Sequence, residues 1–153
     1  MMTTRFISKH LHSSFFGGNW TGVCLKEALD HVSFNHATAK SPNHNSILGI
    51  VYHMSYYVKG ISEVLSEREL MIKDEYSWDF PSIADEDGWQ DFKADVFDLV
   101  RHTCLLIEQM DASLLDKTFV EVKYGTYAHN LWGLIEHTHY HLGQISLLKK
   151  QSL

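Results

Sequence analysis

The sequence predicts an all-α protein, a four-helix bundle with long crossover connections between its helices. Three stretches, 45–69, 87–110 and 126–150, repeat apolar residues at the i, i+3, i+4, i+7 spacing of an amphipathic helix. Only two prolines occur, Pro42 and Pro81, and both lie outside these stretches. Because little of the chain alternates as a strand does, we expect four helices of about 20 to 25 residues whose apolar stripes form one core.

The three long helices are justified by their own residues. The stretch 45–69 places nine apolar residues on one face: Ile47, Ile50, Val51, Met54, Tyr57, Val58, Ile61, Val64 and Leu65. The stretch 87–110 follows consecutive acidic residues, which stabilise a helix N-terminus because they complement the helix dipole. The stretch 126–150 ends on Lys149 and Lys150, and two cations suit the opposite end of a helix dipole.

The remaining segments are less regular. Residues 1–32 are expected to form one interrupted helix or two short ones, because the helical pattern meets a glycine pair at 17–18. Segments 70–88 and 111–125 are predicted to be irregular, the second with a short extended stretch at 119–124. Segment 70–88 is longer than the connection of a tight helical hairpin, so a crossover or a functional loop is expected there.

Composition indicates one globular domain spanning 1–153. The chain is 44% hydrophobic and 21% charged, close to the average for globular proteins. Thirteen basic and 19 acidic residues give a formal net charge of −6, which disfavours nucleic acid as a partner. No apolar run approaches the roughly 20 residues that cross a bilayer, and the N-terminus lacks the apolar region of a signal peptide. A cytoplasmic protein without a membrane partner is therefore expected.

Histidine, with 11 copies, is the residue type that indicates chemistry. On a helix at about 100° per residue, His137 and His141 lie on one flank of the apolar stripe. Two imidazoles at this spacing can bind one metal ion. His53 lies at the equivalent edge of the 45–69 stretch and is its only histidine, so it is the candidate third ligand. His139 falls on the far side of its helix.

No sequence motif indicates a different kind of active or binding site. Cys24 and Cys104 are far apart without a Cys-x-x-Cys pattern, which argues against a disulfide framework and a thiolate zinc site. No Gly-x-Ser-x-Gly elbow and no glycine-rich phosphate loop occurs. A ferritin-like di-iron centre needs two Glu-x-x-His motifs, and only Glu136 with His139 matches. Histidine-bound metal is the chemistry that the residues favour.

Two segments resemble the signature segments of the DinB-like superfamily. They are SILGIVYHM at 46–54 and EHTHYHLGQI at 136–145, and the early GGNWTG at 17–22 is similar to the start of one subgroup. The resemblance covers most of the chain by order and spacing, and the middle helix by pattern alone. One departure is Leu142, because the family typically has arginine at this position.

The resemblance implies a four-helix bundle with a long crossover, often a homodimer, that holds a divalent metal ion such as zinc or nickel on three histidines. His53, His137 and His141 fall on those family positions. Characterised relatives include thiol-dependent transferases and an isomerase. The resemblance therefore says more about the site than about the substrate.

The residues and the resemblance together predict a divalent-metal-binding protein that acts as a metal-dependent enzyme, either a hydrolase or a thiol-dependent transferase. Three neutral imidazoles leave an open coordination position for water or for a small-molecule substrate such as a thiol. Tyr57 and Gln144 are candidate orienting groups, and no catalytic residue is assigned. Two alternatives stay open: a non-catalytic metal-binding or stress-associated bundle, and a decayed site with purely structural histidines.

Overall fold

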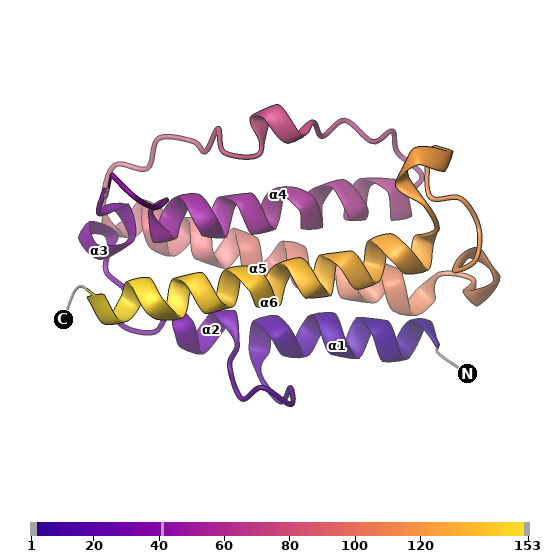
Figure 1. Ribbon diagram of the computed structural model, residues 1–153, viewed down its shortest axis with the longest axis horizontal. Helices are drawn as coiled ribbons and strands as arrows, with labels where there is room; N and C mark the ends of the chain where they lie inside the picture. Colours follow the sequence, from indigo (N-terminus) through magenta and orange to yellow (C-terminus); the bar gives the residue numbers. More distant parts are fainter. Residues whose placement is uncertain (1–2, 41, 152–153) are drawn as a thin grey trace.

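The computed structural model describes residues 3–40 and 42–151, and this part of the chain is all-helical (Figure 1). Its α-helices are α1 (Thr4–Phe16), α2 (Leu25–Ala28), α3 (Phe34–Thr38), α4 (Ile47–Leu65), α5 (Glu86–Gln109) and α6 (Tyr127–Gln151). Single 3-10 turns are η1 (Asp74–Tyr76), η2 (Ala112–Leu114) and η3 (Val122–Tyr124). The described residues contain no β-strand, and an isolated antiparallel bridge joins Thr118 to Thr126.

Local capping sets where the long helices begin. The Ser46 hydroxyl accepts a hydrogen bond from the Gly49 N–H at 3.1 Å, and the Asp85 carboxylate accepts one from the Gly88 N–H at 2.9 Å. Each bond satisfies a backbone donor that has no partner inside the helix. Helix α1 stops at its C-terminal Gly17, which adopts a φ of 104°, a conformation that favours glycine.

The four longest helices lie side by side (Figure 1). Helix α1 packs against α5 and α6, and α4 packs against the same two helices. Figure 1 shows α4 and α5 running in the same direction, so the chain between them must return along the whole length of a helix. Residues 66–85 make this return along the outside of α4, and we call them the crossover segment.

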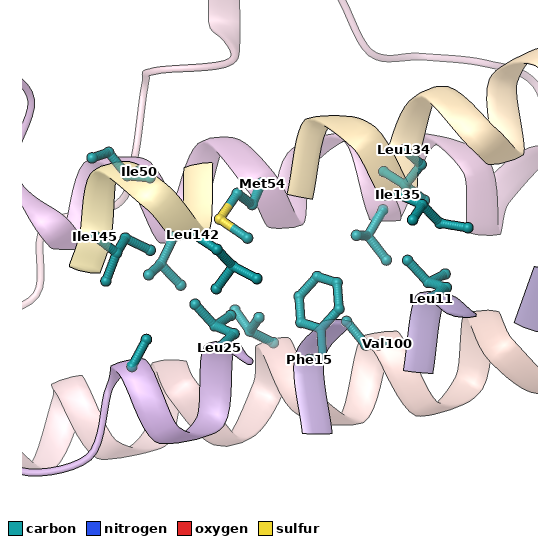
Figure 2. Packing of buried hydrophobic residues seen from close by; sticks show 14 of the residues in the cluster. Leu11, Phe15, Leu25, Ile50, Met54, Val100, Leu134, Ile135, Leu142 and Ile145 are labelled. Carbon is teal, nitrogen blue, oxygen red and sulfur yellow. The ribbon is translucent and has the colours of Figure 1, made fainter. Parts of the chain in front are cut away.

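A continuous apolar core joins the four helices (Figure 2). Leu11 and Phe15 reach it from α1, Met54 from α4, Val100 from α5 and Leu142 from α6, each at most 2% exposed. Burial of one such side chain stabilises the fold by roughly 1.5–3 kcal/mol. The core therefore holds α4 and α6, the helices that carry the candidate histidines, in a defined relation.

The all-helical class and the three long helices are confirmed. The uniform length of 20 to 25 residues is wrong, because α1 has 13 residues and α4 has 19. The N-terminal region is resolved as two helices rather than one, and α3 was not predicted. The extended stretch at 119–124 is also wrong, since residues from Val122 onward turn into η3. Among the described residues, no helix is long and apolar enough to cross a membrane.

Candidate metal centre

Helices α4 and α6 bring the three predicted histidines together. His53 is on α4, and His137 and His141 lie one turn apart on the facing side of α6. His53 and His141 are buried, with 7% and 4% exposure, and His137 is half-buried. The site is thus set by two packed helices rather than by loops, which favours a defined geometry.

The Nε2 atoms of the histidine cluster, His53, His137 and His141, point at one another. His137 Nε2 lies 3.1 Å from His53 Nε2 and 3.0 Å from His141 Nε2. The candidate ligand atoms of the three residues all lie within 4.8 Å of one another. Zinc–nitrogen distances of about 2.0–2.1 Å in a tetrahedral site place two ligand nitrogens about 3.4 Å apart. The two short spacings therefore come within a few tenths of an ångström of a metal site.

The outer nitrogens of two rings are held by carbonyl oxygens. His141 Nδ1 donates to Gln144 Oε1 at 2.7 Å, and His53 Nδ1 donates to the Ser77 backbone oxygen at 3.3 Å. Because these oxygens only accept, the proton of each neutral ring is on Nδ1 and the Nε2 lone pair is free. Metal-binding histidines are usually oriented by such a hydrogen bond to their second nitrogen.

These tautomers leave more Nε2 lone pairs in the cluster than protons to satisfy them. The free lone pairs of His53 and His141 both face His137 Nε2, and one proton on that atom can satisfy only one of them. His137 Nδ1 is buried and has no hydrogen-bond partner among the described residues. A cation between the three Nε2 atoms would satisfy all three lone pairs at once, so the donor set fits a bound metal ion.

Burial and mutual repulsion favour the neutral rings that a metal requires. Burial, followed by the neighbouring His141 and His53, lowers the pKa of His137 to about 4. Burial and then His141 lower the pKa of His53, and burial lowers the pKa of His141. At neutral pH the three imidazoles are therefore uncharged and able to act as ligands.

The surroundings of the cluster come largely from the crossover segment. The Trp78 ring stacks on His53 with ring centroids 3.9 Å apart and planes 10° apart. Tyr57 meets the His137 ring edge-on at 5.0 Å and donates its hydroxyl proton to Asp74 Oδ1 at 3.0 Å. Sequence reasoning missed Asp74, Ser77 and Trp78, because an irregular segment has no periodicity that assigns its residues to a face. Its unusual length was the one available signal.

The structure also places the other residues considered from sequence. Gln144 contacts His141, as expected of an orienting group. His139 lies outside the cluster, and burial, followed by the neighbouring His10 of α1, lowers its pKa. Leu142 is 2% exposed in the core (Figure 2), so no basic side chain reaches the site from this position.

A cavity of about 600 Å³ opens beside His137. Its walls come from α4, α6, the start of the crossover segment and the loop that precedes α6. Tyr57 and Asp74 line it together with His137, and Asp74 is the one carboxylate among the lining residues described. The histidine cluster is therefore reachable from a pocket of the size that small molecules occupy.

A scan against protein-family models and searches of curated proteins and of solved structures return no match for this chain. The geometry of the histidine cluster and of its cavity is therefore what indicates a functional site.

In metal-free protein, we expect the free energy of unfolding to fall as the pH drops from about 6.5 towards 4. Histidines of the unfolded chain bind protons near pH 6.5, whereas His137 resists protonation until about pH 4. The unfolded state therefore binds more protons in this window, and stability present above pH 6.5 is lost as the pH falls. Urea unfolding between pH 7.5 and 4.5 in a chelator measures the slope.

Two variants control this pH experiment. His137→Asn should reduce the slope, since it removes one of the three cluster rings whose pKa is lowered. The same substitution at exposed His102 of α5 should leave the profile unchanged. An unchanged slope in His137→Asn would contradict the assignment.

Proposed function

We propose that the chain is a divalent-metal-binding protein of the DinB-like type that acts as a metal-dependent enzyme. The observation that carries the proposal is the convergence of three Nε2 atoms, two of them on rings whose Nδ1 protons are held by Ser77 and Gln144. The parallel α4 and α5 with a crossover between them support a four-helix bundle of that type. The same proposal includes a homodimer and a cytoplasmic location.

His53, His137 and His141 would hold the ion. A set of three imidazoles suits several transition metals, and we propose zinc or nickel. When bound, such an ion supplies Lewis acidity that favours the deprotonated form of a coordinated water or thiol at neutral pH. Cys24 and Cys104 are buried and lie outside the cluster, so neither thiol competes for this role.

The protein's own groups would position a substrate and move a proton. The cavity beside His137 gives a small molecule access to the open side of the cluster. Trp78 covers the His53 ring and excludes water from that side. Burial raises the pKa of Tyr57, so its phenol stays protonated and donates to Asp74. Asp74 is thus an oriented carboxylate in the cavity wall, and we propose it as the proton acceptor of a hydrolase or thiol-transferase reaction.

Cobalt substitution tests the enzyme against the structural-metal alternative. We expect millimolar azide or a small thiol such as 2-mercaptoethanol to change the visible spectrum of the cobalt protein and to compete with one another. Such exchange requires an open coordination position, as in catalytic metal sites. A four-coordinate spectrum that neither ligand alters would instead favour a non-catalytic metal-binding bundle.

Asp74→Asn is the matched test of the proton acceptor. This variant keeps the size of the side chain and an oxygen that can accept from Tyr57, but it loses the base. We expect unchanged metal content and azide binding, together with at least a hundredfold loss of turnover, the usual scale of general-base catalysis. Turnover equal to that of the wild type would remove Asp74 from the mechanism.

A further inference from the structure

The cavity beside His137 has walls of predominantly apolar chemistry. Four apolar side chains line it: Ile61 of α4, Ile72 of the crossover segment, Phe119 of the loop that precedes α6, and Leu134 of α6. They enclose about 600 Å³, within the range of pockets that bury most of a small organic ligand. Apolar surface that a ligand covers in such a pocket contributes to affinity through the hydrophobic effect.

Several polar groups in the cavity wall are already engaged with the protein. Asp74 accepts from Tyr57, and Asn130 Nδ2 donates to two backbone oxygens at 2.7 and 2.8 Å. The Lys73 ammonium lies 5.9 Å from the centre of the Tyr76 ring. No cluster of cations lines the cavity among the residues described, so the pocket is poorly suited to a phosphorylated or polyanionic ligand.

Open space continues along α6 to the histidine cluster. Gly133 lines the cavity one helical turn before His137, and the two positions share a face of the helix. A Cβ atom built at Gly133 would meet no atom within 4 Å. The absence of a side chain at this position therefore leaves room for a ligand next to the ring of His137.

From these observations we infer that the cavity binds the apolar body of a small organic substrate, a short alkyl chain or a single aromatic ring, with its polar head group directed at His137. The inference rests on the proposed function, because the head group is the part that would reach the metal. It specifies the substrate class: an uncharged, largely apolar compound with one metal-binding or metal-activated group.

Alkyl hydroxamates test this substrate class, since the head group binds metal ions and the tail length can be varied. Calorimetry would compare acetohydroxamate, butanohydroxamate and hexanohydroxamate on the zinc-loaded protein. We expect about a three- to fourfold gain in affinity for each added methylene, because each one leaves water for an apolar wall. An equal affinity across the series would overturn the inference.

Gly133→Leu fills the cavity and should abolish the gain with tail length while zinc content stays at the wild-type level. Gly143→Leu is the matched control, because Gly143 is on the same helix, is exposed and also has no atom within 4 Å of a built Cβ. We expect this control to keep the full dependence on tail length. A Gly133→Leu protein that behaves like its control would contradict the placement of the tail.

Binding of an apolar probe to metal-free protein tests the apolar pocket independently of the proposed metal site. Toluene, an uncharged single-ring probe, should bind the chelated wild-type and Gly143→Leu proteins in saturation-transfer NMR and should not bind Gly133→Leu. Probe binding without hydroxamate binding would support the apolar pocket and count against the metal. If the probe fails to bind the wild-type protein, the apolar pocket is wrong, whatever the cluster binds.

Discussion

Chelation of the metal-loaded protein should lower its melting temperature by about 10 °C, and added zinc or nickel should restore it. An ion that binds only the folded state stabilises it by about 4 kcal/mol when its free concentration is a thousandfold above the dissociation constant. For a chain of this length, each kcal/mol corresponds to roughly 2–4 °C. Differential scanning calorimetry with and without a chelator measures the shift.

Single substitutions assign this shift to the histidine cluster. His53→Ala, His137→Ala and His141→Ala should each abolish it, because each removes one of three converging Nε2 atoms. His139→Ala is the matched control, since it is on the same helix but outside the cluster. Metal content after dialysis gives a second readout that does not depend on thermal unfolding. Equal loss of the shift in all four variants would refute the cluster as the binding site.

Trp89→Ala should lower the free energy of unfolding by about 3–5 kcal/mol, the range for removing a large buried aromatic side chain. Trp89 of α5 is fully buried, and its Nε1–H donates to the Val32 backbone oxygen at 2.9 Å. The substitution leaves a cavity and also removes the donor from that oxygen. Urea unfolding followed by circular dichroism at 222 nm measures the loss.

Trp20→Ala provides the contrast, because Trp20 is fully exposed and its removal should change stability by no more than about 0.5 kcal/mol. Trp89→Phe should fall between the two, since it keeps an aromatic ring and loses only the hydrogen bond and part of the volume. A loss below about 1 kcal/mol in Trp89→Ala would show that the Trp89 side chain and its hydrogen bond to Val32 contribute little to the stability of the fold. Metal content should stay unchanged in all three variants, as none of these side chains belongs to the histidine cluster.

The crossover segment supplies much of the environment of the histidine cluster. It is required by the parallel course of α4 and α5, and its return along α4 places Ser77 and Trp78 against His53. The same segment supplies Asp74 and part of the cavity wall. A single topological feature thus supplies an orienting oxygen, a covering ring and the candidate proton acceptor.

Features that depend on local periodicity could be predicted from the amino-acid sequence. Helical spacing predicted α4, α5 and α6, because a face that repeats every 3.6 residues must be buried wherever the helix packs. The same period placed His137 and His141 one turn apart on one flank of α6, and it excluded His139 from that flank. His53 followed as the third candidate because α4 has no other histidine.

The surroundings of these histidines depend on how the helices and the crossover segment pack. Periodicity cannot say which neighbour faces a helix flank, so the meeting of His53 with the α6 pair depends on how α4 and α6 pack in the shared core. Ser77, Trp78 and Asp74 lie in a segment without a repeating pattern, and their positions follow from the path of the chain over α4. The cavity likewise exists only where segments distant in sequence leave space between them.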